Sequence, residues 1–355
     1  MKRSRKYVGL DVHQATTVIT VRNEAGPVAA RLVVATEAAA LRAVFRGMRG
    51  EIHVALEEGT QAQWLHDLLV PLVHRVVVCN RRGAPPQGNK ADQSDADELS
   101  ELLRCGRLRA VYHGSPDRAK LKELARTYRN LVEDSTRVML RLKALFRARA
   151  IKTPGRAVYA ADQRRTWLAQ LTEPGVRFRA EMLYGELALL QELRPKAKTA
   201  MLAEAKRDPA WRVLRTIPYL GPVRVALLIA TLQTPWRFRT KRQLWAYAGF
   251  AVVLRTSAEY EMDGGRAVRR RRRLVQTRGL NRNHNRVVKE VFKGAATAAA
   301  ARSGALRDWY EGLLTRGMRE ELARVTLARK LAAITLHLWK RGERYDGTQL
   351  TVHAG

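Results

Sequence analysis

Four acidic residues have positions and spacings that suit metal binding or catalysis by carboxylates. Asp11 lies in the otherwise apolar run Val8–Val12, where a lone charged carboxylate is costly to bury unless it is paired or binds a metal. Glu57 closes a second short apolar run. Asp92 and Asp95 are spaced i, i+3, which puts both on one face of a helical turn. Because Mg²⁺ prefers carboxylate oxygens and water as ligands, the set predicts a site for one or two magnesium ions.

Each acid also has a purely structural interpretation. Asp92, Asp95 and Asp97 could be helix-start residues that complement the helix dipole. Glu57 could belong to a solvated strand end. Asp11 is the hardest to explain in this way, because an interior strand position gives it no easy access to water, and the set as a whole favours the metal site.

Residues 1–114 read as alternating strands and helices, which would position these acids. Seven elements are predicted in turn: strands over Lys6–His13, Thr16–Arg22 and Arg31–Ala35, a helix over Glu37–Met48, a strand over Ile52–Leu56, a helix over Gln61–Leu72 and a strand over Val76–Cys79. The order β-β-β-α-β-α-β is that of an α/β RNase H-like domain. It places Asp11 in the first strand and Glu57 at the end of the fourth.

Residues 115–210 predict two long helices. The first begins at the capping signal Ser115-Pro116-Asp117, and the second covers Val176–Arg207 with a predicted kink at Pro195. The pair could form a hairpin within the chain or a coiled coil between subunits. The first helix carries a heptad seam broken once, at Ser135: Leu121, Leu124, Tyr128, Leu131, Ser135, Val138, Leu142 and Leu145.

Residues 211–355 predict a mostly helical domain. The turn Ile217-Pro218-Tyr219-Leu220-Gly221-Pro222 leads into an apolar helix over Val223–Leu232, and a packing helix around Glu321–Lys340 ends the pattern. Such a turn could be the hairpin of a helix-hairpin-helix module, whose backbone amides hold a DNA phosphate, or an ordinary turn between helices.

The charge of the chain predicts a polyanionic partner. Its 355 residues hold 66 Lys and Arg against 33 Asp and Glu, a net charge of +33, and no run approaches the roughly 18 apolar residues of a membrane span. Cys79 and Cys105 are too few for a disulfide framework or a four-cysteine zinc site, and the protein is expected in the cytoplasm.

The predicted nucleic-acid contacts are Arg255, Arg266, Arg269, Arg270, Arg271, Arg272, Arg273, Arg278, Arg282, Arg286 and Lys289. The five-arginine run taken alone could equally be a solvated loop.

Several motifs together resemble the DEDD transposases of bacterial insertion sequences, recombinases guided by a bridge RNA. They are GLDVH, ALEEGT, KADQSDADELSELL, IPYLGP, YAGFAVVLRTSAEY and RGLNRNHNR. The resemblance implies an RNase H-like domain of the Holliday-junction-resolvase type over 1–114, a helical coiled-coil linker over 115–210 and a C-terminal transposase domain over 211–355.

The resemblance also implies roles for single residues. Asp11, Glu57, Asp92 and Asp95 would bind magnesium, and Ser257 would attack a DNA phosphate to form a covalent phosphoserine link. A serine hydroxyl needs activation to act as a nucleophile, and a carboxylate-bound metal with arginines nearby is a sensible setting for it.

The sequence departs from the family pattern at three places. Glu58 follows Glu57 where the family has alanine, and we assign Glu57 because strand alternation puts it on the face of the small Ala55. Thr256 precedes Ser257 as a second hydroxyl, and Ala258 follows it in place of the usual glycine. Tyr219 stands where the hairpin motif has glycine.

The sequence therefore predicts a site-specific recombinase that moves its own insertion sequence. Its partners would be donor and target DNA duplexes, a structured guide RNA and further copies of itself, as a dimer or tetramer that completes the active site between subunits, in the bacterial cytoplasm at the nucleoid. Two alternatives stay open: a junction-resolving nuclease that uses water in place of Ser257, and a nucleic-acid-binding protein without catalysis.

Overall fold

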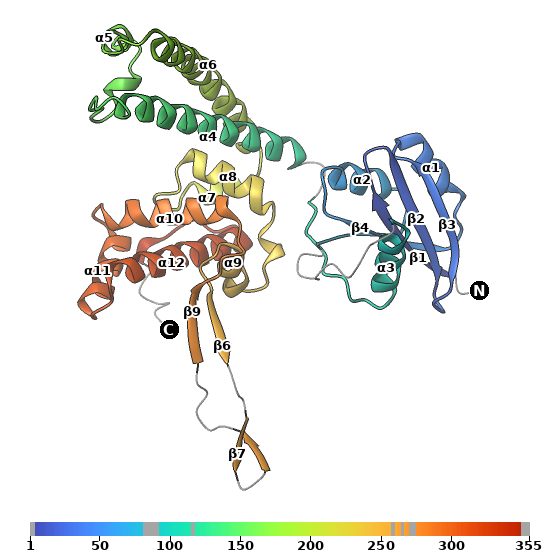
Figure 1. Cartoon of the computed structure of the whole chain (residues 1–355). Helices are drawn as coiled ribbons and strands as arrows, with labels where there is room; N and C mark the ends of the chain where they lie inside the picture. The colour runs from blue at the N-terminus through green and yellow to red at the C-terminus, as the bar shows by residue number, and fades with distance from the viewer. Residues whose placement is uncertain are drawn as a thin grey trace. The chain divides into compact units, whose positions relative to one another are not determined.

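The computed structural model describes residues 4–80, 92–114, 118–256, 260–263, 266–269 and 275–348 (Figure 1). The chain forms two compact units, Met1–Pro116 and Asp117–Gly355. Within the described ranges no helix has the length and apolar character needed to cross a bilayer. Ser115, Pro116 and Asp117, the predicted helix cap, lie outside the described residues.

The first unit is built on one mixed sheet of five strands in the order β3-β2-β1-β4-β5. Strands β1, β2 and β3 are antiparallel neighbours, whereas β4 runs parallel to β1 and β5 parallel to β4. This order confirms the predicted RNase H-like fold. The strands are β1 (Arg5–Val12), β2 (Thr16–Asn23), β3 (Val28–Ala35), β4 (Glu51–Glu57) and β5 (Arg75–Cys79).

Alternation along the strands divides the core of this unit between two faces of the sheet. Val8 and Leu10 of β1 face helices α1 (Ala38–Gly47) and α2 (Ala62–Leu69), where they join a buried apolar cluster. Tyr7 of β1 and Ala55 of β4 face the opposite side and pack with Leu99 and Leu103 of α3 (Asp92–Arg104). The two layers are visible on either side of the sheet in Figure 1.

The predicted pair of long helices is a hairpin within one chain. Helix α4 (Ala119–Arg147) packs along α6 (Pro174–Ala205), with η2 (Ala157–Tyr159) and α5 (Arg164–Ala169) between them in sequence. Six of the eight residues of the α4 seam are buried and the other two, Leu124 and Leu131, are half-buried. Helix α6 is one helix through Pro195. At the break in the seam, the Ser135 hydroxyl donates to the Leu131 carbonyl at 2.6 Å, so the polar side chain is satisfied locally.

The base of this hairpin shares the core of the remaining helices. Leu121 of α4 and Met201 of α6 belong to the same buried cluster as α8 and α12, while the outer half of the hairpin has a core of its own. The C-terminal helices are α7 (Ala210–Leu214), α8 (Pro222–Leu232), η3 (Pro235–Arg237), α9 (Lys241–Tyr247), α10 (Arg286–Ala300), α11 (Ala305–Thr315) and α12 (Glu320–Arg341).

Two small antiparallel strand pairs interrupt this helical region. β6 (Val252–Thr256) pairs with β9 (Val275–Leu280), and β7 (Tyr260–Asp263) pairs with β8 (Arg266–Arg269). No strands were predicted here, because short segments rich in arginine lack the apolar alternation of a buried strand. The region is largely helical, as predicted, with these ribbons added.

Candidate active site

The strand register brings Asp11 and Glu57 to the same edge of the sheet. Leu10 and Leu56 are paired in the parallel ladder between β1 and β4, so the residue that follows each of them lies at the same strand end. Asp11 is two residues from Gly9, and Glu57 two residues from Ala55, so both acids belong to the face that α3 covers.

Glu58, the alternative to Glu57, lies beyond the last residue of β4. Its backbone N–H donates to the Cys79 carbonyl at 2.8 Å, and its Oε2 accepts a hydrogen bond from the Asn80 amide at 3.2 Å. Glu58 is thus tied to the end of β5, while Glu57 keeps the strand alternation that aligns it with Asp11.

His13, the residue that follows the end of β1, contacts Asp11. Its Nε2 lies 3.1 Å from Asp11 Oδ2, and the Asp11 side chain is 19% exposed against 45% for His13. Asp11 is therefore a partly buried carboxylate with an ionisable partner at its solvent side. An i, i+2 spacing across a strand end was the only sequence signal for this contact.

Helix α3 lies directly on the backbone of β1 at Gly9. A Cβ on Gly9 would stand 2.0 Å from the Ala96 carbonyl oxygen and 2.7 Å from the Ser100 nitrogen, so only glycine permits this approach. Asp95 immediately precedes Ala96. The position of this acid is therefore set by the contact between α3 and Gly9.

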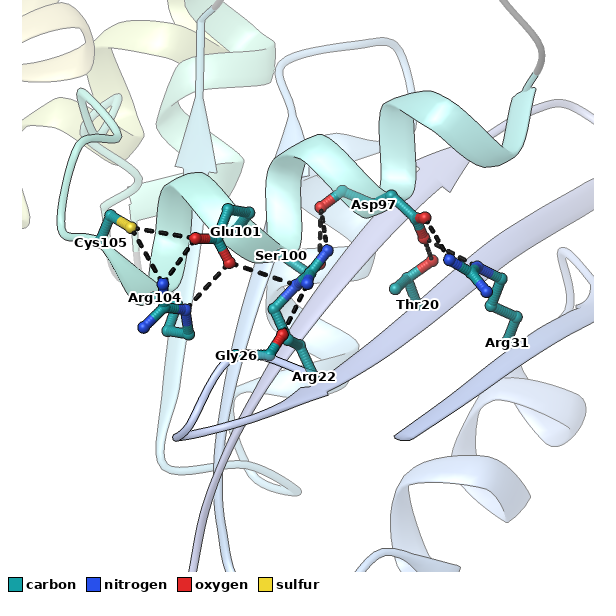
Figure 2. Close-up of polar contacts among 9 residues, drawn as sticks. All are labelled: Thr20, Arg22, Gly26, Arg31, Asp97, Ser100, Glu101, Arg104 and Cys105. Carbon is teal, nitrogen blue, oxygen red and sulfur yellow. Dashed lines mark hydrogen bonds and ion pairs between the residues drawn. The ribbon is translucent and has the colours of Figure 1, made fainter. Parts of the chain in front are cut away.

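The polar contacts of α3 show which way it runs over the sheet (Figure 2). Thr20, opposite Gly9 in the ladder, donates to Asp97, whereas Arg22, opposite Tyr7, reaches Ser100 and Glu101. The helix therefore runs antiparallel to β1. Its start, with Asp92 and Asp95, lies toward the strand end that carries Asp11.

Asp97 anchors the first half of α3. Its Oδ1 accepts from the Thr20 hydroxyl at 2.6 Å and from Arg31 Nε at 3.1 Å, and its Oδ2 accepts from Arg31 Nη2 at 2.6 Å. The hydrogen bond from Arg31 lowers the pKa of Asp97, against the opposing effect of burial. Asp97, which the sequence left as a dipole-complementing residue, is the acid of an ion pair to β3.

A second group of contacts anchors the other half of α3 (Figure 2). Arg22 donates to the Ser100 hydroxyl at 3.2 Å and forms an ion pair with Glu101 at 3.4 Å. Arg104 donates to both Glu101 oxygens, at 2.9 and 2.6 Å, and this is the main reason that the pKa of Glu101 falls to about 2. We call these residues the α3 clamp: Thr20, Arg22, Arg31, Asp97, Ser100, Glu101 and Arg104.

The donor set suits a hard divalent cation. The carboxylates of Asp11 and Glu57 lie at one edge of the sheet, and the α3 segment with Asp95 begins toward that edge, so the acids offer oxygen ligands. The free thiol of Cys79, the ladder partner of Glu57, is buried in the apolar cluster beside them. Among the side chains that the structure describes, no three His, Cys, Asp or Glu residues gather closely enough to hold a metal. The side chain of Asp92 lies outside that set.

Ser257 follows the last residue of β6 and, like Arg270–Arg273, lies outside the described residues. The paired strands on either side of it carry much of the predicted basic cluster. Arg255 is in β6, Arg269 in β8 and Arg278 in β9. Arg266, Arg282 and Arg286 are exposed and Lys289 is half-buried.

The motif RGLNRNHNR fixes the base of the β6–β9 ribbon. The Asn281 side chain donates to the Ala246 carbonyl at 3.1 Å, and Asn285 caps α10 by accepting from the Val288 N–H at 3.1 Å. The His284 ring packs where a Cβ on Gly249, which has a φ of +71°, would collide with it. These contacts give the polar motif a structural role.

The turn before α8 holds Tyr219 in a left-handed conformation, with a φ of +64°. The hairpin motif has glycine at this position because glycine alone adopts that conformation freely. The flanking carbonyls are satisfied by arginine, since Arg224 donates to Tyr219 O and Arg215 donates to Leu220 O, both at 2.8 Å. The turn thus keeps its shape without the glycine.

Two family models match the chain, one for each part of this architecture. A model of DEDD transposases of the IS110 type, described as "Transposase", matches residues 8–149. A second, described as "Transposase IS116/IS110/IS902 family", matches residues 211–278. The chain belongs to the IS110 family of transposases. No curated protein matches it.

Each of the two family matches falls mainly in one of the two units of the chain. The first match covers most of the RNase H-like unit, which is therefore the DEDD domain of an IS110-family transposase. The matched residues include the four predicted metal ligands, Asp11, Glu57, Asp92 and Asp95. The second contains the turn at Tyr219 and the β6–β9 ribbon up to Arg278. The transposase acts on DNA, which agrees with its net charge of +33.

Proposed function

We propose that this IS110-family transposase exchanges DNA strands through a covalent phosphoserine intermediate, with Ser257 as the nucleophile. The Ser257 Oγ forms a bond to a DNA phosphorus, and the deoxyribose oxygen of the broken phosphodiester leaves with a proton. A hydroxyl from another strand then attacks the same phosphorus and releases the serine. One phosphodiester is exchanged for another, so resealing needs no ATP.

The acids of the RNase H-like unit would hold magnesium, as a set formed by Asp11, Glu57, Asp92 and Asp95. A divalent cation there would neutralise charge on the reacting phosphate and favour deprotonation of a nearby hydroxyl. The observation that carries this proposal is the common edge of Asp11 and Glu57 under α3. His13 would orient the Asp11 carboxylate until a cation competes for it.

The basic residues around Ser257 would hold the nucleic-acid backbone beside the reacting phosphate. Arg266, Arg282 and Arg286 are exposed, and their charge suits contacts to phosphates without base reading. Target choice would then come from pairing with a structured guide RNA, for which the protein supplies charge and shape.

We further propose that the transposase works as a dimer or tetramer whose subunits complete one another's active sites. The α4 seam is filled by α6 of the same chain, so self-association would use another surface. Phe178, Met182 and Leu189 of α6 are 61%, 55% and 55% exposed and share one helical face. This apolar stripe supports a contact between copies.

A strand-exchange assay with matched acid variants tests the proposal. Asp11→Asn and Glu57→Gln should abolish exchange between donor and target DNA, whereas Glu58→Gln, a neighbour tied to Asn80, should retain it. Mixing Asp11→Ala with Ser257→Ala protein should restore part of the activity if sites are shared between subunits. Full activity of Asp11→Asn would refute the metal site, and the absence of any rescue would refute sharing.

A further inference from the structure

Trp236 is the most exposed large apolar residue of the described chain, at 69%, and it is held outward by a rigid turn. It lies in η3, which the Thr234 side chain caps and which has the buried Pro235 at its first position. The adjacent Arg237 guanidinium lies 4.5 Å from the centre of the Tyr247 ring. Single exposed apolar residues are common, but this one is fixed in place.

A cavity of about 370 Å³ opens beside Trp236. A second tryptophan, Trp339, and Val213 contribute apolar walls, and Arg118 and Asp208 contribute polar ones. The volume is within the range of small-ligand sites. All of these residues belong to the second unit, so the cavity is formed within it.

Positive charge surrounds this aromatic surface. The Lys340 ammonium lies 5.4 Å from the Trp236 ring centre and is fixed by donating to the Phe238 carbonyl at 2.6 Å. The acid in the cavity, Asp208, is paired with Arg118 at 3.0 Å. Arg341 is paired with Glu343 at 3.5 Å. With both acids compensated, Lys340 and the exposed Arg239 favour an anionic ligand.

We propose that Trp236 and the cavity beside it bind an unpaired nucleotide of a single-stranded nucleic acid. The base would stack on the Trp236 ring, and Lys340 and the exposed Arg239 would attract the phosphates that flank it. An exposed aromatic ring beside fixed cations is the arrangement that binds single strands without reading their sequence. A duplex cannot use it, because its bases are stacked on each other.

This inference rests on the proposed function only in taking nucleic acid as the partner. The unpaired nucleotide could come from a loop of a guide RNA or from a DNA strand released during exchange. Both present the same chemistry, a free base on a phosphodiester backbone, and separate RNA and DNA probes distinguish them.

Fluorescence anisotropy with labelled oligonucleotides of about ten nucleotides tests the site. Trp236→Ala should weaken binding of single-stranded RNA, DNA or both roughly five- to hundredfold, the range expected for one stacked base. Trp236→Phe should retain most of the affinity. Trp64→Ala, which removes another exposed tryptophan from the first unit, is the matched control and should bind as the wild type does.

An abasic strand separates stacking from charge. Wild type and Trp236→Ala should bind it equally, because the backbone remains and the base is gone. Equal binding of normal strands by wild type and Trp236→Ala would overturn the proposal, as would an equal loss on the abasic strand. Competition by polyglutamate that depends on Trp236 would also overturn it, since it would assign the site to an acidic peptide.

The outcome is separable from that of the proposed function. Binding needs no catalysis, so loss of affinity in Trp236→Ala can be observed even if no phosphoserine adduct forms. Conversely, an active enzyme whose single-strand binding ignores Trp236 would refute this site alone. Circular dichroism should show a native fold for Trp236→Ala, because the substituted side chain is largely outside the core.

Discussion

Replacing Gly9 by alanine should displace helix α3 and the acid that it carries. The new Cβ would lie 2.0 Å from the Ala96 carbonyl oxygen, and carbon atoms of this kind essentially never approach another heavy atom closer than 3.0 Å. The helix must therefore move by about 1 Å, because both sides of the contact are backbone and neither can rotate away.

The size of the effect follows from this displacement. Overpacking of a well-filled site costs about 1–3 kcal/mol of unfolding free energy. Asp95 would move with Ala96, and a shift of about 1 Å in a catalytic group can lower a rate by about a hundredfold. Gly9→Ala should therefore lose more activity than its lower stability explains.

Urea unfolding followed by circular dichroism gives the stability, and strand-exchange rates at saturating magnesium and DNA give the activity. Gly47→Ala is the control, since nothing lies within 4 Å of a Cβ at that position. If Gly9→Ala matches this control in both measurements, the close approach of α3 to β1 is wrong. A loss of stability with a normal rate would mean that the contact does not position the acids.

Three other features of the molecule, two ion pairs and one exposed apolar stripe, can be tested by substitution. The pKa of Glu101 is lowered from the ordinary 4.5 to about 2, so its bond to Arg104 stabilises the fold above pH 4.5 and loses that effect as the pH falls toward 2. The difference in urea midpoint between wild type and Glu101→Gln should therefore shrink over that interval. A difference that stays constant with pH would contradict the contact. Arg31→Ala should lower the urea midpoint only slightly, since the pair with Asp97 is partly exposed. A double-mutant cycle with Asp97→Ala should show coupling that fades in high salt, and additive losses would mean that the pair contributes nothing. Phe178→Glu combined with Met182→Glu should lower the oligomeric state seen by sedimentation, while an unchanged mass would remove the α6 stripe as a contact.

The sheet could be predicted from the sequence because its strands are apolar runs set apart by polar turns. The segment that contains Val8, Leu10 and Asp11 and the segment that ends at Glu57 both have the apolar character and length of buried strands. The order of helices between them then left few topologies. The strand order confirmed the RNase H-like fold, and the two family models confirmed the family that the motifs indicated.

What the sequence left open depends on contacts between distant segments. A heptad seam looks the same whether α6 or a second subunit fills it, so the hairpin could not be chosen from α4 alone. The α3 clamp joins Thr20 and Arg31 to Asp97 across more than 60 residues, and nothing local marks these side chains as partners. The roles of the four acids and of Ser257 stay predictions.

If Ser257 is the nucleophile, it becomes covalently joined to DNA in a reaction that needs the acids and magnesium. Incubating the transposase with labelled donor DNA and Mg²⁺, then denaturing it, should give a protein–DNA adduct whose modified peptide contains Ser257. The adduct should form in Thr256→Ala and disappear in Ser257→Ala, in Asp11→Asn and after chelation of the metal. DNA cleavage by Ser257→Ala at the wild-type rate with no adduct would contradict the account, because water would then be the nucleophile.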